Sequence, residues 1–255
     1  MDILFTICGR AGSKGIKNKN LKDFIGYPLP FYTLSALDLY RRQQTDFSTD
    51  IVLNTDSDDL AALFTENVCI DIDYVKRPAE LGLDSTPKVA VMLNSLLSME
   101  SRKEKRYDMV VDVDITSPLR TADDIEHLIS AKMAGDADVV FSVTDSRRNP
   151  YFNMVRQDGD RYVRVIDSTF NTRQAAPQIY DMNASLYAFS PDFLKSGKGI
   201  FEGKCGIIKM MDTAVLDLDH LIDFEYMEVI AAYLFEKYPA YKAVRENIAS
   251  IIKSA

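Results

Sequence analysis

The chain has 255 residues, 47% of them apolar, and a net charge of −8. This composition excludes an intrinsically disordered protein, and the length allows one large α/β domain. The negative charge disfavours general binding to nucleic acids, so any phosphate compound must be held by local basic loops.

Cysteine and histidine are scarce, which limits the chemistry. The three cysteines, Cys8, Cys69 and Cys205, lie far apart and predict neither a disulfide framework nor a zinc site. Two histidines give little support to a histidine-rich metal centre or a histidine-dependent triad. No apolar run reaches the ~18 residues that span a bilayer. The first expected strand follows the start of the chain at once, so we expect no signal peptide and a cytoplasmic location.

Strand and helix patterns alternate along most of the chain. The expected strands are 3–7, 51–53, 70–75, 109–113, 139–143, 184–189 and 214–216. The expected helices are 29–40, 57–67 with Ser57 as its N-cap, 87–100, a helix capped by Thr121, 221–238 and a short helix to about residue 252. Strand–helix units in this order predict a Rossmann-like, three-layer α/β fold with a mostly parallel sheet. We expect a single domain over residues 1–255.

Residues 146–183 interrupt this alternation. Asp158-Gly159-Asp160 is typical of a hairpin turn, here between expected strands at 152–155 and 162–166. We therefore expect a small sub-domain that leaves the main sheet within the single domain.

The segment Cys8–Asn20 is rich in glycine and in basic residues, and it follows the first buried strand. Glycines let backbone N–H groups approach an anion closely, and Arg10, Lys14 and Lys19 would offset the charge of a phosphate. The spacing of its three glycines matches neither a Walker A loop nor a Gly-x-Gly-x-x-Gly fingerprint. The segment indicates a phosphate site of another kind, with a solvated surface turn as the alternative.

Charged side chains follow several of the expected strands. Arg10, Lys14, Asp56, Arg77 and Asp114 each come just after one. Because ligands of parallel α/β sheets bind outside the carboxyl ends of the strands, we expect these five residues to meet at one crevice.

The pair Asp217-x-Asp219 follows the last expected strand. Alternation along a strand places both carboxylates on one face, where they suit Mg²⁺. The alternative is an acidic start to the helix that follows.

Lys88 and Cys8 each allow a structural and a functional interpretation. Lys88 opens an expected helix, where a cation opposes the helix dipole, so we expect it to face an anion or a carboxylate such as Asp84. Cys8 ends a buried strand without a histidine nearby in sequence, so core packing is expected rather than nucleophilic catalysis.

Arg173 and Gln174, with Asn183 and Tyr187, form another polar group. They are candidates for binding a carbohydrate or a carboxylate, since arginine binds carboxylates through two hydrogen bonds. An exposed polar loop is equally compatible with these residues.

Four motifs occur in order along the chain. They are Arg10-x-x-Ser13-Lys14-Gly15-x-x-x-Lys19-Asn20, Arg77-Pro78-Ala79-Glu80-Leu81, Thr116-Ser117-Pro118-Leu119-Arg120 and Asp217-x-Asp219. Together they resemble the acylneuraminate cytidylyltransferases, the CMP-sialic acid synthetases, over nearly the whole chain. Members of this family use CTP and Mg²⁺ to join a nine-carbon 2-keto sugar acid to CMP, and they release pyrophosphate.

The resemblance implies roles for residues across the chain. It implies a triphosphate site at Arg10, Ser13, Lys14 and Lys19, a cytidine site at Asn20, Arg77 and Lys88, a sugar site at Arg173, Gln174, Asn183 and Tyr187, and a Mg²⁺ site at Asp217 and Asp219. Arg10, Lys14 and Asp217 would act in catalysis. The resemblance also implies a homodimer, because residues 146–183 fall where the family builds a dimerisation element.

Two positions depart from the family pattern. Asp114 stands where a glutamine is usual, and Asp181 stands where a sugar-facing arginine is typical. Both changes make the sugar site more negative, and the strand end Asp112-x-Asp114 is similar to the legionaminic acid branch. Substrates of that branch are 5,7-diamino sugar acids, whose N-acyl groups could donate N–H hydrogen bonds to Asp114.

Other functions stay open at this point. Two are transfer of CMP to pseudaminate or to 3-deoxy-manno-octulosonate. Another is a non-catalytic nucleotide-binding protein of the same fold, which the intact acidic pair and basic loop disfavour. A Rossmann oxidoreductase is disfavoured by the glycine spacing and by the lack of an acidic residue ~20 residues after the loop.

Overall fold

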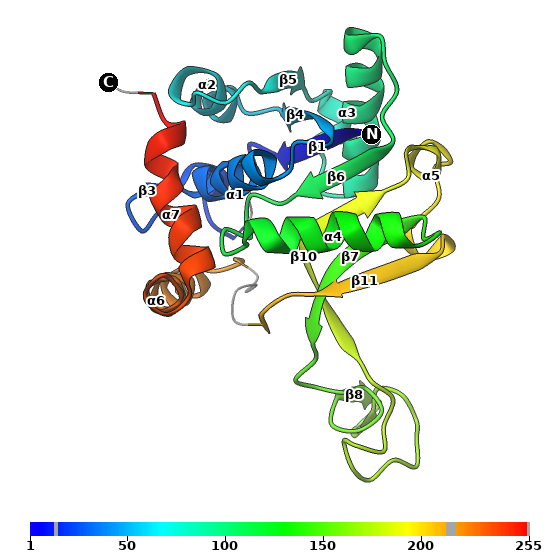
Figure 1. Cartoon of the computed structure of the whole chain (residues 1–255). Helices are drawn as coiled ribbons and strands as arrows, with labels where there is room; N and C mark the ends of the chain where they lie inside the picture. Colours follow the sequence, from blue (N-terminus) through cyan, green and yellow to red (C-terminus); the bar gives the residue numbers. More distant parts are fainter. Residues whose placement is uncertain (13–14, 213–217, 254–255) are drawn as a thin grey trace.

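Helices cover both faces of one central sheet, which gives the molecule three layers (Figure 1). The computed structural model describes residues 1–12, 15–212 and 218–253. Over these residues the sheet has seven strands in the order β11-β7-β10-β6-β1-β4-β5. Their bounds are β1 Asp2–Gly9, β4 Ser48–Thr55, β5 Asp73–Lys76, β6 Met109–Val113, β7 Val139–Asp145, β10 Tyr180–Phe189 and β11 Cys205–Lys209. β10 runs antiparallel to both neighbours and the other pairs are parallel, so the expected mostly parallel α/β fold is confirmed.

The helices pack on the sheet through two separate apolar clusters. The helices are α1 Leu29–Gln43, α2 Asp58–Asn67, α3 Lys88–Lys103, α4 Ala122–Ala134, α5 Pro191–Lys195, α6 Leu221–Lys237 and α7 Pro239–Ile251, with short 3₁₀ turns at Lys19–Leu21, Ala79–Leu81 and Ile200–Glu202. Alternation along β1 sends Ile3, Phe5 and Ile7 into the larger cluster, with α1, α4, α6 and α7. Leu4 enters the smaller cluster, with α3 and α5. Within the described parts of the chain, no helix combines the length and apolar character needed to cross a bilayer.

Both expected N-caps are confirmed. The Ser57 hydroxyl accepts a hydrogen bond from the Leu60 backbone N–H at 3.2 Å. Thr121 and Asp124 form a reciprocal capping box at the start of α4. These caps satisfy N–H groups that a helix start leaves without partners, so both helices begin where the local sequence indicates.

Several strand positions differ from those expected. β5 starts at Asp73 rather than at residue 70, and the expected strand at 214–216 lies outside the described residues. β11 was not expected, because Cys205–Lys209 has only two adjacent large apolar residues. The segment is an edge strand because it pairs in parallel with β7.

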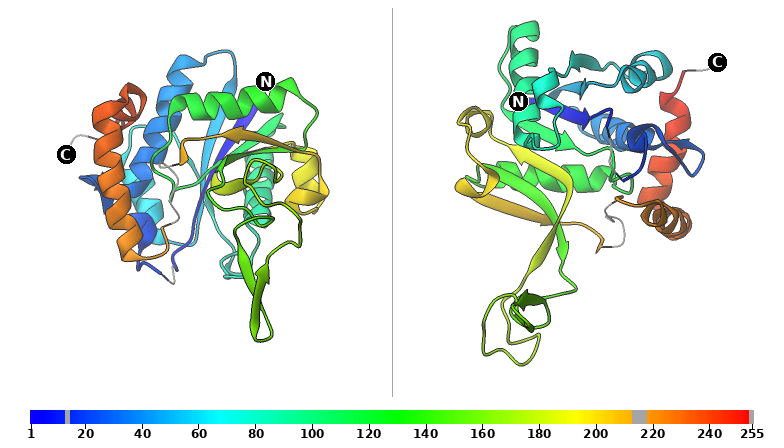
Figure 2. Two further views of the ribbon diagram at one scale, coloured as in Figure 1. Left: turned by 90° about the horizontal axis from the view of Figure 1, so that it is seen from below. Right: turned by 180° about the vertical axis from the view of Figure 1, so that it is seen from behind.

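Residues 146–179, called the arm below, leave the body between β7 and β10 (Figures 1 and 2). The arm contains the antiparallel hairpin β8 Val155–Asp158 and β9 Arg161–Arg164. Gly159 has φ +64° at its turn, a conformation that favours glycine. The expected turn is confirmed, whereas its strands differ in their bounds.

A second small hairpin joins β2 Asp23–Phe24 and β3 Tyr27–Pro28 in the body.

Candidate active site

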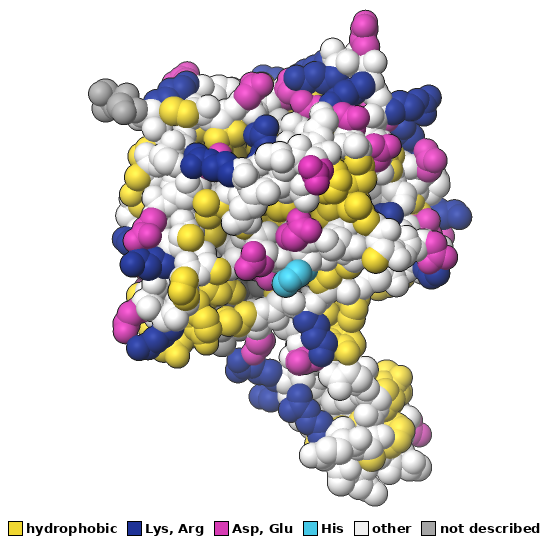
Figure 3. Space-filling model, viewed as in Figure 1, with side chains coloured by type: hydrophobic (Ala, Val, Ile, Leu, Met, Phe, Trp, Pro, Cys, Tyr) yellow, Lys and Arg dark blue, Asp and Glu magenta, His cyan; other side chains and the backbone are white. Residues whose placement is uncertain are grey.

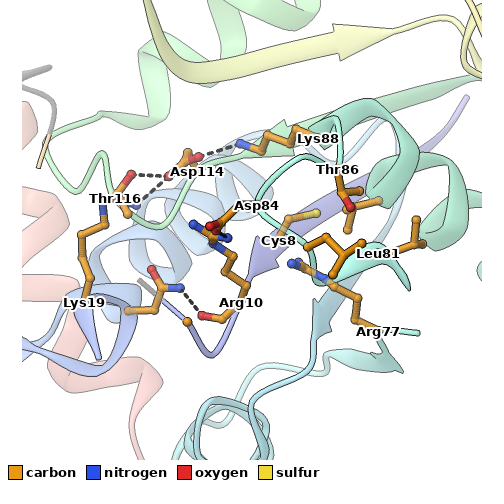
Figure 4. A pocket seen from close by; sticks show the side chains of 14 residues that line it. Cys8, Arg10, Lys19, Arg77, Leu81, Asp84, Thr86, Lys88, Asp114 and Thr116 are labelled. Carbon is orange, nitrogen blue, oxygen red and sulfur yellow. Dashed lines mark hydrogen bonds and ion pairs between the residues drawn. The ribbon is translucent and has the colours of Figure 1, made fainter. Parts of the chain in front are cut away.

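A pocket of about 270 Å³ opens beyond the carboxyl ends of β1, β5 and β6. Figure 4 shows side chains from these strand ends, and from the segment before α3, around it. Predicted site residues that line it are Arg10, Lys19, Asn20, Arg77, Lys88 and Asp114. The structure therefore places most of the predicted nucleotide-site residues with Asp114 in one pocket.

Arg10 leaves the end of β1 and forms an ion pair with Asp84 across the pocket. The Asn20 side-chain amide donates to the Arg10 carbonyl at 3.2 Å. The Ala11 N–H donates to Asp56 Oδ1 at 2.8 Å, so Asp56 supports the loop backbone. The start of the first loop is thus held by short polar contacts from two other segments.

Lys19 connects the first loop with the turn before α6. Its ammonium donates to the Leu218 carbonyl at 2.7 Å and lies 4.0 Å from Asp219 Oδ1. Gly15 touches the same turn, because a Cβ at Gly15 would lie 1.8 Å from the Asp219 carbonyl oxygen. The two loops therefore meet at a point where only glycine fits.

Arg77 is buried at the end of β5, with 7% exposure. Its Nε donates to Asn54 Oδ1 at 3.0 Å and its Nη2 to the Asn54 carbonyl at 2.8 Å. The Asn54 amide donates in turn to Asn94 and Ser95 on α3, at 3.0 Å each. This network holds the Arg77 guanidinium in one orientation at the pocket wall.

Lys88 lies between two aspartates at the end of β6. Its Nζ is 2.6 Å from Asp112 Oδ2 and 2.6 Å from Asp114 Oδ2. The expectation that Lys88 faces a carboxylate is confirmed, but its partners are Asp112 and Asp114 rather than Asp84, because Lys88 in the first turn of α3 lies against the end of β6. Asp84 pairs with Arg10 instead.

These contacts set the charge states around Lys88. Burial acts to raise the pKa of Asp114, but the Lys88 charge and hydrogen bonds from Lys88 and Thr116 lower it to about 2. Burial acts to lower the pKa of Lys88, but Asp112 and Asp114 together raise it above its usual range. Burial and then Asp112 raise the pKa of Cys8, which disfavours the reactive thiolate and fits a packing role.

Asp112 and Arg120 also support this pocket, although neither was predicted as a site residue. Asp112 is fully buried and accepts a hydrogen bond from Thr6 Oγ1 at 2.9 Å. Arg120 is also fully buried, and its Nη2 donates to the carbonyls of Asp114 and Ser117. Burial lowers the pKa of Arg120 to about 10, against the opposing effect of the nearby carboxylates. In the sequence, the sign of this buried charged cluster is Asp112, an aspartate inside the apolar run at 109–113.

The four residues expected at the sugar do not form one site within the chain. Arg173 and Gln174 lie on the arm beside a separate cavity of about 90 Å³. Arg173 Nη2 donates to the Ser146 carbonyl at 2.7 Å. Tyr187 is buried beside the main pocket, with the Lys88 ammonium 5.8 Å from its ring centre.

Asn183 is buried in β10 near an irregularity of that strand. Its Oδ1 accepts hydrogen bonds from Ser142 Oγ at 2.5 Å and from the Ser185 N–H at 3.2 Å. The register of β10 with β7 shifts between Met182 and Tyr187. Asp181 is exposed at the base of the arm and is not among the residues that line the pocket of Asp114.

Sequence comparison places the chain among known enzymes. Residues 4–238 match the family described as Cytidylyltransferase. The chain belongs to the cytidylyltransferase family. This protein is accordingly a nucleotidyltransferase, and the resemblance drawn from its motifs is confirmed.

Curated relatives of this cytidylyltransferase include sugar-acid enzymes. It is 33% identical to a CMP-N,N'-diacetyllegionaminic acid synthase of Campylobacter jejuni, over 90% of this chain and 94% of that protein. It is 32% identical to the post-translational flagellin modification protein B of Campylobacter coli, over 90% and 94% of the two chains. It is 26% identical to an N-acylneuraminate cytidylyltransferase of Streptococcus agalactiae, over 94% of this chain and 54% of that protein.

Solved structures share the fold of this cytidylyltransferase. A CMP:2-keto-3-deoxy-manno-octonic acid synthetase complexed with CTP aligns with a TM-score of 0.62 at 14% identity, over 91% of this chain and 99% of that chain. A 4-diphosphocytidyl-2C-methyl-D-erythritol synthase from Anaerococcus prevotii aligns with a TM-score of 0.61 at 17% identity, over 91% and 96% of the two chains.

The side chains that could hold Mg²⁺ in this cytidylyltransferase lie at the turn before α6. Ser13, Lys14 and Asp217 lie outside the described residues. Residues 1–12, 15–212 and 218–253 hold no cluster of three or more His, Cys, Asp or Glu side chains suited to a metal. The Asp219 carboxylate, however, is 72% exposed beside the basic loop. Mg²⁺ binds through one or two carboxylates together with water and substrate phosphates, so these donors fit it.

Proposed function

We propose that this cytidylyltransferase transfers CMP from CTP to a nine-carbon 2-keto sugar acid of the legionaminic type. The proposal rests on how charged side chains are distributed in the pocket, with basic residues in one part of the lining and a carboxylate in another. Arg10 and Lys19 lie in the phosphate-loop part of the lining, and the Asp114 carboxylate lies beside Lys88 (Figure 4). The 33% identity to a CMP-N,N'-diacetyllegionaminic acid synthase supports the choice of sugar acid.

The reaction is an in-line displacement at the α-phosphorus of CTP. The anomeric hydroxyl of the sugar acid forms the new P–O bond, the bond to the β-phosphate breaks, and pyrophosphate leaves as the hydroxyl gives up its proton. The sugar's own C–O bond stays intact, so its anomeric configuration is retained. The chain's part is to position the reactants and to neutralise charge.

In this proposal the first loop binds the triphosphate through Arg10, Ser13, Lys14 and Lys19. Asn20 and the fixed guanidinium of Arg77 frame the cytidine. Because Asn54 holds two of the Arg77 nitrogens, Arg77 needs no reordering when the nucleotide binds. Asp217 and Asp219 would hold Mg²⁺, which polarises the phosphate oxygens when bound.

Asp114 accounts for the preference among sugar acids. Its depressed pKa keeps the carboxylate ionised at neutral pH, and an ionised carboxylate only accepts hydrogen bonds. N-acylamino groups of a 5,7-diamino sugar acid supply N–H donors of the required kind. A glutamine at the same position would offer both a donor and an acceptor.

We also propose a cytoplasmic homodimer in which the arm completes the partner's sugar site. The arm holds Arg173 and Gln174 away from the pocket of its own chain. It also exposes Val155 at 64% and Tyr162 at 74%, and such apolar side chains suit an interface. Arg173 would then meet the carboxylate of a sugar acid bound to the partner.

A pyrophosphate-release assay tests the proposed reaction. The protein is incubated with CTP, Mg²⁺ and, separately, a legionaminic, an N-acetylneuraminic, a pseudaminic and a 3-deoxy-manno-octulosonic acid. We expect the highest kcat/KM with the legionaminic acid. Preference for another acid contradicts the substrate, and no release with any acid supports a non-catalytic nucleotide-binding protein.

Two charge-removing variants test the phosphate and metal roles. Lys14→Ala and Asp217→Asn should each lower turnover at least ~10²-fold, the loss typical of removing a major charge stabiliser. Lys17→Ala is the control, since Lys17 is exposed and is not among the lining residues of the pocket. Near-wild-type pyrophosphate release by both variants contradicts these roles.

A further inference from the structure

Lys88 forms ion pairs with two carboxylates although it lines the same pocket as Arg10 and Lys19. Asp112 and Asp114 each place one oxygen 2.6 Å from its ammonium. The Asp112 side chain has no solvent exposure, and that of Asp114 has 19%. The three groups together carry a net charge of −1, because two carboxylates surround one ammonium. The two carboxylates therefore offset the charge of Lys88, which has little net positive charge to offer a triphosphate.

The hydrogen bonds of Asp114 leave little capacity for a ligand. Its Oδ1 accepts from the Thr116 N–H and the Thr116 hydroxyl, both at 2.7 Å. Its Oδ2 accepts from Lys88 at 2.6 Å. A carboxylate oxygen accepts about two hydrogen bonds, so one acceptor position on Oδ2 is left at the pocket surface.

The backbone beneath Asp114 is also fixed. Arg120 donates to the Asp114 carbonyl from the buried side. The Asp114 N–H donates to the Ser185 carbonyl at 3.1 Å. The peptide is therefore held on both sides. Thr116 holds Oδ1 of the carboxylate, and the Lys88 contact fixes Oδ2.

We propose that Lys88 is a positioning residue for the sugar acid: it directs the remaining acceptor position of Asp114 Oδ2 at a single N–H donor of the acceptor substrate. Lys88 therefore governs the binding of the sugar acid and leaves CTP binding largely unchanged, unlike the cytidine role that the motif resemblance implies. This inference rests on the proposed function.

The test uses variants that separate the effect of the Lys88–Asp114 contact from the effect of the buried Asp112. Asp112→Asn keeps the Lys88–Asp114 ion pair. Lys88→Met combined with Asp112→Asn removes that pair without leaving a charged Asp112 alone in the core. Lys103→Met is the matched control, because Lys103 also lies between two aspartates, 2.9 Å from Asp73 and 4.0 Å from Asp50, at the other end of α3.

Three quantities are measured for each full-length variant: the melting temperature, the KM for the sugar acid, and the Kd for CTP alone. For the double variant we expect a KM for the sugar acid about 10- to 100-fold above wild type, which is typical of losing a charged hydrogen bond. Its Kd for CTP should stay within about 3-fold of wild type. Lys103→Met should leave both constants near wild type. Asp112→Asn, which keeps the Lys88–Asp114 contact, should raise the KM for the sugar acid clearly less than the double variant does.

Asp114→Asn provides a second route if the double variant does not fold. It removes the carboxylate while Lys88 keeps Asp112 as its counter-ion, and it should raise the KM for the sugar acid with little effect on CTP. A weaker Kd for CTP with an unchanged KM for the sugar acid overturns the inference. An equal rise of that KM in Asp112→Asn also overturns it, since packing would then be responsible. Absence of wild-type turnover with every acid overturns the proposed function itself.

Discussion

The Arg10–Asp84 ion pair places a carboxylate against a guanidinium that the proposed triphosphate must also contact. Both side chains are partly exposed, at 35% and 45%, so the pair contributes only about 0.2–1 kcal/mol. We expect Asp84→Asn to tighten CTP binding by about two- to five-fold, because the nucleotide then no longer competes with the Asp84 carboxylate for Arg10. Titration with CTP at low salt measures the change.

The control for this prediction is Asp58→Asn. Asp58 forms an exposed ion pair with Lys76 at 3.7 Å and is not among the pocket-lining residues. It should leave CTP binding unchanged. Weaker CTP binding by Asp84→Asn would mean that Asp84 helps to form the nucleotide site.

Asp114 should also affect how the free energy of unfolding changes in acid. Its pKa is about 2 in the folded protein against 3.8 for the unperturbed group. The ionised carboxylate therefore stabilises the fold above pH ~4, and this contribution is lost as the pH falls toward 2. A shift of this size corresponds to about 2 kcal/mol.

Urea unfolding of wild type and Asp114→Asn from pH 6 to pH 2 tests that assignment. We expect the wild-type advantage in unfolding free energy to shrink by about 2 kcal/mol between pH 5 and pH 2. Asp181→Asn, which alters an exposed carboxylate at the base of the arm, serves as the control. A constant difference across this range would contradict the ion pair with Lys88.

At the scale of loops and strands, the first loop and the turn before α6 depend on one glycine contact. A Cβ at Gly15 would overlap the Asp219 carbonyl, whereas a Cβ at Gly12 would meet no atom within 4 Å. We expect Gly15→Ala to separate the loops and to raise the KM for CTP about 10-fold, and Gly12→Ala, whose Cβ meets no atom, to raise it clearly less. Similar effects of both substitutions would show that general loop stiffness, and not this contact, matters.

Elements with local signals could be predicted from the sequence. Ser57 and Thr121 mark helix starts because a cap depends on residues within one turn. β11 could not be predicted, because it is a strand through pairing with β7, more than 60 residues earlier. The partner of Lys88 was missed for the same reason, since it depends on how α3 sits against β6. The placement of Arg10, Arg77 and Asp114 at one pocket followed from the general rule for parallel sheets.

On the scale of the whole molecule, the arm stands away from the body, and basic side chains gather where it leaves the body (Figure 3). Sequence adjacency placed Arg173 near Asn183, but the fold puts Arg173 on the arm beside its own small cavity. In the proposed homodimer, Arg173 would instead reach the sugar site of the partner, because the arm holds it away from the pocket of its own chain. The proposed homodimer therefore links assembly to activity through the arm.

Mixing two inactive variants tests this link. Arg173→Ala removes the arm contribution, and Arg10→Ala removes the phosphate contribution, so each homodimer should have little activity. A mixed dimer contains one site with both wild-type residues, and random mixing makes half of the dimers mixed. We therefore expect recovery of about a quarter of wild-type pyrophosphate release.

The control for the mixing experiment introduces a charge on the hairpin. Tyr162→Asp, at a side chain that is 74% exposed, should halve the mass measured by light scattering while the melting temperature stays close to wild type. In the Arg10→Ala chain it should also abolish recovery on mixing, because the arm no longer reaches a partner. Full activity of a monomeric Tyr162→Asp protein would show that each chain completes its own sugar site, and that Arg173 is confined to the structure of the arm.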